Sequence, residues 1–241
     1  MGRYLALFVP DAVVEMRESP FLPDLPHERV TYLARRIAAT KVPASDRKLE
    51  DDREPLYGEV EFEKRRIRGR SKAFGVIYDG IHLQRVFTGL IATKERLLSI
   101  AHIIFTNRLF ATWDTGDRRY HLRTSVYGVP SIVSSSGIVE APARPREFYM
   151  LKQQYQSLGR DPTEVKARFA GRFIDYDDER LTDIAKGMAL QAVAYCLTGD
   201  PFCEDRGCRL FNAHWQEDLI FAQLTNQYEL CPRHARLLGR T

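Results

Sequence analysis

The spacing of hydrophobic positions divides the chain into two parts, with short alternating runs up to about residue 140 and helical periodicity after it. Alternating and β-branched runs in the first part predict strands at 3–9, 56–62, 73–78, 81–87, 102–105, 120–127 and 131–139. Asp79-Gly80 is typical of a hairpin turn between two of these strands. A helix is expected at 27–40 and a short one at 93–101, with a charged loop at 42–55. The buried face of the longer helix would carry Val30, Leu33, Ile37 and Ala38.

Helical periodicity follows the turn sequence Ala-Pro-Ala-Arg-Pro at 141–145. Four helices are expected there, at 147–158, 162–173, 178–197 and around 215–227. The third has a broad apolar stripe, formed by Leu181, Ile184, Ala185, Met188, Ala192, Val193 and Cys196. Gly199 is its expected C-cap. These patterns predict an α/β fold in which a sheet is followed by helices, with the 178–197 helix packed on the sheet.

Chain length and composition indicate the number of domains and the cellular compartment. The chain has 241 residues, of which 44% are hydrophobic and 28% charged, so residues 1–241 are expected to form a single domain. No apolar run approaches the roughly 18 residues of a membrane span, and the first residues lack the features of a signal peptide. Four cysteines suit a reducing compartment, and we expect a cytoplasmic protein without a membrane partner.

A net charge of +4 raises the question of nucleic-acid binding. The run 64–72 is densely basic, but Glu59, Glu61 and Glu63 precede it, which favours the charged outer face of a strand followed by a solvated turn. A second basic set includes aromatic residues and would fit either a nucleic-acid surface or, preferably, the outer face of a sheet. It consists of Arg108, Arg118, Arg119, Arg123, Arg144 and Arg146 with Trp113, Tyr120 and Tyr127.

The most specific chemical signal is at the C-terminal end. Cys203-x4-Cys208 is followed by Cys231-x2-His234, two short hooks of the kind that bind zinc. Thiolate and imidazole ligands suit Zn(II) better than calcium or magnesium. Four protein ligands leave no position open for water, so the sequence predicts a structural zinc in a tail at 199–241.

The same tail resembles that of the archaemetzincins, in which H-E-x-x-H-x-x-G-x-x-H-C-x4-C-x-M precedes a later C-x-x-C. The resemblance rests on Gly199, on the two hooks with Arg209-Leu210 after the first, and on Leu230 and Pro232-Arg233 in the second. Upstream, Ile103-Ile104-Phe105-Thr106 and Ser131-Ile132-Val133-Ser134 look like the two strands before the active-site helix of that family. The resemblance implies a metzincin-like fold and a place in a prokaryotic branch of metallopeptidase-like proteins.

The resemblance stops at the catalytic residues. The family's three zinc-binding histidines would fall on Ala192, Cys196 and Phe202, and its general-base glutamate on Val193. Alanine, valine and phenylalanine cannot hold a zinc hydroxide or take a proton from its water, so the metzincin mechanism cannot operate with these groups, and Cys196 is the one possible ligand left in the motif. Cys196, on the apolar stripe, is expected to be a buried thiol without a catalytic role.

A rearranged metal site is a further possibility that the sequence leaves open. His102 and His121 with a carboxylate such as Glu140 or Asp114 would provide three ligands, although their intervals match no known motif. His214 is expected to pack near the zinc-binding tail, where it could orient a ligand.

The leading hypothesis is a metallopeptidase-like zinc protein of unknown substrate that lacks H-E-x-x-H catalysis and acts by binding an unknown protein or peptide partner. A hydrolase or peptidase with a rearranged metal site is the second hypothesis. A zinc-stabilised nucleic-acid-binding protein is the third and is not favoured, and the catalytic residues are unknown.

Overall fold

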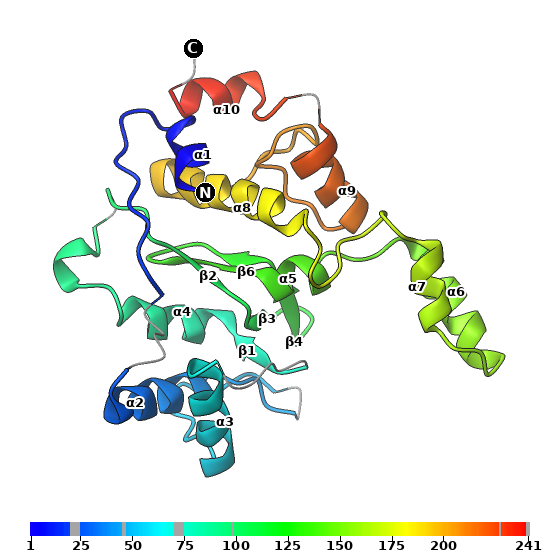
Figure 1. Ribbon diagram of the computed structural model, residues 1–241, viewed down its shortest axis with the longest axis horizontal. Coiled ribbons are helices and arrows are strands. Elements are labelled where there is room, and N and C mark those ends of the chain that lie inside the picture. Colours follow the sequence, from blue (N-terminus) through cyan, green and yellow to red (C-terminus); the bar gives the residue numbers. More distant parts are fainter. Residues whose placement is uncertain (20–24, 45–46, 70–74, 98, 227, 240–241) are drawn as a thin grey trace. The chain divides into compact units, whose positions relative to one another are not determined.

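The computed structural model describes residues 1–19, 25–44, 47–69, 75–97, 99–226 and 228–239. The chain forms two compact units (Figure 1). One unit combines residues 1–14 with 135–241, and the other comprises residues 15–134. In the described residues every strand belongs to the second unit, and the first is built of helices. The protein is therefore mixed α/β, as its sequence predicts.

The strands of the second unit form two three-stranded sheets. In one sheet, β1 (Ile77–Asp79) runs parallel to β3 (Leu109–Asp114), which pairs antiparallel with β4 (Arg119–Arg123). In the other, β2 (Ile103–Thr106) runs parallel to β6 (Ser131–Ser134), which pairs antiparallel with β5 (Ser125–Val126). Parallel pairs need a crossover, and the chain between β1 and β3 contains α4 (Gly80–Thr88) and the 3₁₀ turn η1 (Thr93–Glu95).

Helices α2 (His27–Ala38), α3 (Tyr57–Ile67) and α4 supply most of the core of this unit. The predicted inner face of α2 is confirmed, because Val30, Leu33, Ile37 and Ala38 are all buried. The strand residues of this core are Tyr78, Phe110, Val126 and Ile132.

Three predicted strands are helices. Segment 56–62 lies in α3, because the residues that turn inward, Val60, Glu63 and Ile67, have helical spacing. The Glu59 carboxylate caps this helix by accepting a hydrogen bond from Leu56 N at 2.9 Å. Segment 81–87 lies in α4, and segment 3–9 overlaps α1 (Gly2–Ala6).

The predicted Asp79-Gly80 hairpin is wrong for a specific reason. Asp79 Oδ1 accepts hydrogen bonds from the backbone N of Ile81 and of His82, both at 3.0 Å, so the aspartate is the N-cap of α4. Gly80 is required because a Cβ there would lie 2.9 Å from Val126 Cγ2. The pair therefore begins a helix in place of a turn.

The remaining boundaries of the second unit are partly as predicted. The strand at 102–105 is confirmed as β2, and 120–127 is divided between β4 and β5. The strand expected at 131–139 ends at Ser134, β3 was not predicted, and the helix expected at 93–101 is reduced to η1. The loop at 42–55 is confirmed for its described residues, while positions 45–46 and 73–74 lie outside the description.

A buried carboxylate, Glu63, lies inside the second unit with no exposed surface. It accepts a hydrogen bond from Tyr78 Oη at 2.5 Å and forms ion pairs with Lys41 at 3.4 Å and Arg108 at 3.1 Å. Burial lowers the pKa of Lys41. Glu63 was expected on a solvated outer face, and the helical geometry of α3 turns it inward instead.

The first unit contains α5 (Ser135–Glu140), α6 (Arg146–Ser157), α7 (Thr163–Arg168), α8 (Leu181–Thr198), α9 (Gln216–Ile220), the π-helical turn η2 (Phe221–Thr225) and α10 (Pro232–Leu237). The predictions at 147–158 and 178–197 are confirmed, with Gly199 as the left-handed C-cap at φ 78°. The segment 162–173 forms only the short α7. The segment 215–227 divides into α9 and η2, with residue 227 outside the description.

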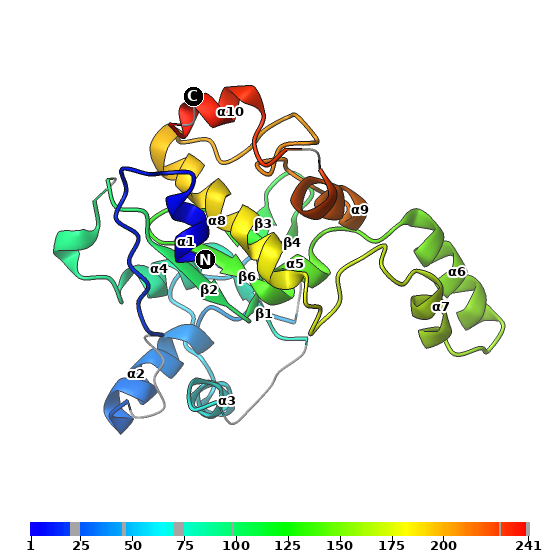
Figure 2. The same ribbon diagram turned by 45° about the horizontal axis from the view of Figure 1, so that its top comes forward.

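Helix α8 is the centre of the first unit, and α1 lies beside it in both views (Figures 1 and 2). Every residue from Gly187 to Ala194 is buried, so α8 is enclosed on nearly all sides. The α6–α7 pair projects away from α8 and α9, and has its own cluster of Phe148, Tyr155, Val165, Phe169 and Phe173. No helix among the described residues combines the length and the apolar character needed to cross a membrane.

Gly187→Ala should destabilise the protein because α8 and η2 meet at this glycine. An added Cβ would lie 1.6 Å from Gln223 Oε1, and Gln223 is fully buried. We expect a loss of about 1–3 kcal/mol in the free energy of unfolding, despite the better helix propensity of alanine. Urea denaturation would measure it. Gly58→Ala on α3 is the matched control, since nothing lies within 4 Å of its added Cβ, and it should stabilise slightly.

Candidate metal centre

The two predicted hooks come together in the first unit. The ligand atoms of Cys203, Cys208, Cys231 and His234 all lie within 4.8 Å of one another. The Sγ atoms of Cys203 and Cys231 are 3.9 Å apart. His234 Nδ1 is 3.8 Å from Cys208 Sγ and 3.2 Å from Cys231 Sγ. Cys208, Cys231 and His234 are buried, and Cys203 is half-buried.

These separations fit a tetrahedral metal ion better than a disulfide. Metal–sulfur bonds of about 2.3 Å give a tetrahedron with edges of about 3.8 Å, close to the observed spacings. A disulfide would need sulfur atoms about 2.05 Å apart, and all four cysteines of the chain are free thiols. The cluster can therefore hold a metal ion, and its three sulfurs and one nitrogen suit zinc.

The first hook is a tight loop closed by backbone hydrogen bonds. Cys203 N donates to Leu210 O at 2.9 Å, and Phe211 N donates to Cys208 O at 2.9 Å. Asp205 shapes the loop by accepting from Gly207 N at 2.9 Å, and its own backbone N lies 3.4 Å from Cys203 Sγ. An amide directed at the sulfur stabilises a thiolate, as metal binding requires.

The second hook is the first turn of α10. Cys231 is the N-cap of this helix, Pro232 follows at its first position, and His234 lies three residues after the cysteine on the same face. Cys231 N also lies 3.5 Å from Cys208 Sγ, so the backbone of the second hook contacts a sulfur of the first.

A network around Arg209 joins the two hooks to the rest of the unit. The Arg209 guanidinium pairs with Glu229 at 2.5 Å, and its backbone N donates to Glu229 O at 3.0 Å. Tyr4 Oη on α1 donates to the same carboxylate at 2.8 Å, and Gln223 Nε2 donates to Arg209 O at 2.8 Å. Gln191 on α8 donates to Phe211 O at 3.2 Å. We call Tyr4, Gln191, Arg209, Gln223 and Glu229 the Arg209 network.

Burial sets the protonation of the ligands. It raises the pKa of the Cys208 thiol to about 12 and raises that of Cys203, while it lowers the pKa of His234. The imidazole is thus neutral and ready to coordinate. The thiols of Cys203 and Cys208 keep their protons until a metal ion displaces them, so metal binding would release protons.

The positions that correspond to catalytic residues of the archaemetzincins lie on and after α8. Ala192 and Val193 are buried, and Cys196 and Phe202 are half-buried. Burial raises the pKa of the Cys196 thiol, which disfavours the reactive thiolate. None of these four side chains belongs to a metal-binding group in the described part of the chain.

The alternative metal set is assembled only in part. Asp114 and His121 come together with Asp117, which the sequence reasoning missed although Asp114-x2-Asp117-x3-His121 is a short local interval. This group is largely exposed, and Asp117 Oδ2 already accepts from His121 at 2.8 Å and Arg119 at 2.7 Å. His102 bonds instead to Glu95 O at 2.9 Å, and Glu140 lies on α5 in the other unit. His214 is exposed and is not one of the residues grouped with the four ligands.

The second basic set is divided between the two units, and one of its members is buried. Arg108 is buried against Glu63 in the second unit, while Arg144 and Arg146 belong to the first unit. The guanidinium of Arg144 lies over the rings of Phe148 and Phe173, and that of Arg146 over Trp215. In the run 64–72, Lys64 to Arg68 form the end of α3 and the residue after it, and positions 70–72 lie outside the described residues.

Comparison with known families supports the metallopeptidase resemblance at the level of family. The model of the "Probable metallopeptidase family (DUF6775)" matches residues 3–241, nearly the entire chain. Neither the curated proteins nor the solved structures contain a match to it. The chain therefore belongs to this probable metallopeptidase family.

Proposed function

We propose that this protein is a metallopeptidase-like zinc protein without standard catalysis, in which a structural Zn(II) bound by Cys203, Cys208, Cys231 and His234 stabilises the C-terminal tail. The observation that carries the proposal is the closed cluster of four donors at tetrahedral spacing. Four protein ligands complete the coordination of zinc, and no coordination position remains for a catalytic water.

The absence of catalytic groups at the expected positions points in the same direction. Ala192, Val193 and Phe202 supply no ligand and no general base. An archaemetzincin-like fold that keeps the structural metal and loses the catalytic one would act by binding a protein or peptide partner. Free thiols as ligands suit a reducing, cytoplasmic location.

Metal content per chain tests this proposal. We expect elemental analysis of protein purified without added metal to give one zinc per chain, and none for Cys203→Ser. Two metals in the wild type, with one retained in Cys203→Ser, would contradict it and revive the hydrolase hypothesis. His121→Ala would then show whether the second ion lies at Asp114, Asp117 and His121.

A peptidase assay addresses catalysis separately from metal binding. The folded, zinc-loaded protein should not cleave a mixture of unstructured peptides above the rate of a Cys203→Ser preparation. Cleavage that is sensitive to chelators and survives Cys203→Ser would show an enzyme whose metal is held elsewhere.

A further inference from the structure

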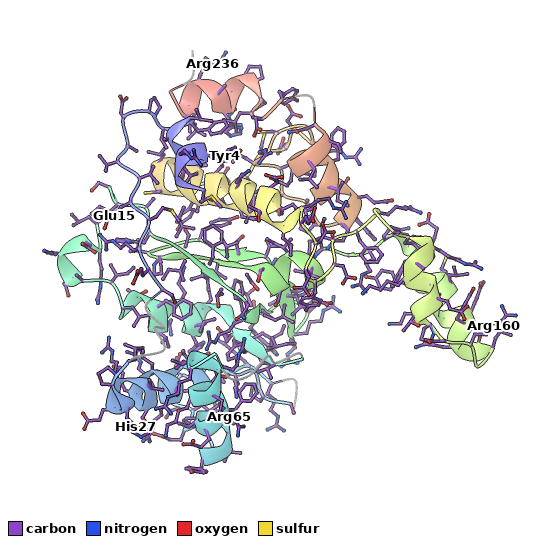
Figure 3. All side chains as sticks on the ribbon, viewed as in Figure 1. Tyr4, Glu15, His27, Arg65, Arg160 and Arg236 are labelled. Atoms are coloured by element: carbon purple, nitrogen blue, oxygen red, sulfur yellow. The ribbon has the colours of Figure 1, made fainter. Side chains whose placement is uncertain are left out.

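Helices α2 and α3 of the second unit pack against each other and run in opposite directions. At one end, Arg68 Nη2 lies 3.1 Å from His27 Nδ1. At the other end, Arg53 donates to Ala38 O at 2.9 Å and binds both carboxylate oxygens of Glu59 at 2.7 Å. Figure 3 marks His27 on α2 and Arg65 on α3. The segment from Arg53 to Arg68 therefore contacts α2 at His27 and at Ala38.

An arginine–tyrosine–arginine stripe occupies the exposed side of α2. Arg29, Tyr32 and Arg36 are spaced by three and four residues, so they follow one another along one side of the helix. The guanidinium carbons of Arg29 and Arg36 lie 5.8 and 5.7 Å from the centre of the Tyr32 ring. Arg36 Nη1 donates to Tyr32 Oη at 3.0 Å, and 51% of Tyr32 is exposed. Three planar groups are therefore held together in solvent.

Several arginines near α2 have no carboxylate ion-pair partner within the part of the chain that the structure describes. Most neighbouring cations have a carboxylate partner: Arg35 pairs with Glu54, Lys64 with Glu61, and Arg53 with Glu59. Among the described residues, no ion pair with a carboxylate involves Arg29, Arg36, Arg65 or Arg68. We call Arg29, Tyr32 and Arg36 the α2 arginine surface. Its excess of guanidinium groups is complementary to a polyanion.

We propose that the α2 arginine surface binds single-stranded nucleic acid, with phosphates on the arginines and a base stacked on Tyr32. Arg29 and Arg36 are about 10 Å apart along the helix axis, a distance that spans two to three nucleotides of about 3.4 Å each. Unpaired bases stack without regard to sequence on exposed aromatic rings that lie among positive charges. Paired bases in a duplex would not reach Tyr32.

An anionic membrane is the other polyanion that an arginine surface could meet. An interfacial helix inserts an apolar face into the lipid. The apolar face of α2 is instead buried in the core through Val30, Leu33 and Ile37, and its exposed side offers Tyr32 among charged residues. The surface therefore fits a nucleic-acid strand better than a bilayer.

This proposal concerns the second unit and does not depend on the zinc site, so either can fail alone. The test is fluorescence anisotropy of a labelled oligothymidylate with the full-length protein, over about 50–200 mM salt. Arg29→Gln/Arg36→Gln should weaken binding and reduce the salt slope by about 1.4, or about 0.7 per lost phosphate contact. Tyr32→Ala should weaken binding about tenfold or more, whereas Tyr32→Phe, which keeps the ring, should bind nearly as the wild type does.

Two further variants sharpen the test. Arg160 and Arg168 also flank a tyrosine ring, at 5.9 and 5.6 Å from the centre of Tyr155, but that ring is 5% exposed. Arg160→Gln/Arg168→Gln removes the same charge and should leave binding unchanged. Glu28→Gln removes the carboxylate of α2 and should tighten binding. Failure of the wild type to bind would overturn the proposal. Equal losses of affinity in Arg29→Gln/Arg36→Gln and Arg160→Gln/Arg168→Gln would also overturn it. Binding to phosphatidylserine vesicles without binding to the oligonucleotide would do the same.

Discussion

Cys208→Ser should abolish binding of the proposed zinc and unfold the C-terminal tail. Cys208 is fully buried and serves the first hook, so a serine hydroxyl at this position would replace a strong zinc ligand with a weak one. In small zinc domains the binding free energy of about 10–16 kcal/mol is also folding free energy. We therefore expect the tail to lose its structure, measured as rapid amide hydrogen exchange from residue 199 onward and a lower thermal midpoint. A chelator should act on the wild type in the same direction.

Cys196→Ser is the matched control for this loss. Cys196 lies on α8, is half-buried and is outside the group of four ligands. It should keep one zinc per chain and a protected tail. If Cys208→Ser lost its zinc but kept its hydrogen-exchange protection, the structural role of the metal would be wrong, and if it kept its zinc, Cys208 would not be an essential ligand.

Glu63→Gln should cost about 3–5 kcal/mol in the free energy of unfolding. Glutamine preserves the size of the side chain and can still accept a hydrogen bond, but it leaves Lys41 and Arg108 in the interior without the charge that faces them. Removing one partner of a buried ion pair leaves an uncompensated charge, which is the costly outcome. Urea denaturation monitored by circular dichroism would give the value.

Two comparisons separate this effect from a general loss of charge. Glu61→Gln disrupts only the partly exposed pair with Lys64 and should change stability by about 0.5 kcal/mol or less. Replacing Glu63, Lys41 and Arg108 together with glutamine, methionine and methionine should cost less than Glu63→Gln alone, because no isolated charge then remains. A triple variant that is less stable than the single one would mean that packing dominates at this position.

The sequence predicts local features where one physical cause is dominant. Helices 147–158 and 178–197 are confirmed because their apolar period is long, and Gly199 because only a glycine favours the left-handed cap. The spacing of the cysteines and the histidine identified the four residues that the structure brings together, since each hook is a local motif. Short segments were predicted less well: Glu59, Glu61 and Glu63 alternate as in a strand, whereas in the structure Glu63 is buried on the inner face of a helix.

Long-range contacts had no signal in the sequence. Nothing in Tyr4 or Glu229 predicts that they meet, since they are 225 positions apart. The contact of Gln191 with Arg209 O, 18 positions away, also has no signal in the sequence. The Asp79 cap was misread because Asp-Gly suits both a hairpin and a helix start, and the neighbouring residues of α4 decide between them.

The contact between Tyr4 and Glu229 also constrains the order in which parts of the protein can fold during synthesis. The chain leaves the ribosome from its first residue, so α1 emerges long before the hooks and the carboxylate to which it binds. Residues 15–134 form a unit whose contacts are complete well before synthesis ends, and they can fold first. The first unit closes only when the tail arrives, which makes it slow to form and leaves α1 dependent on late assembly.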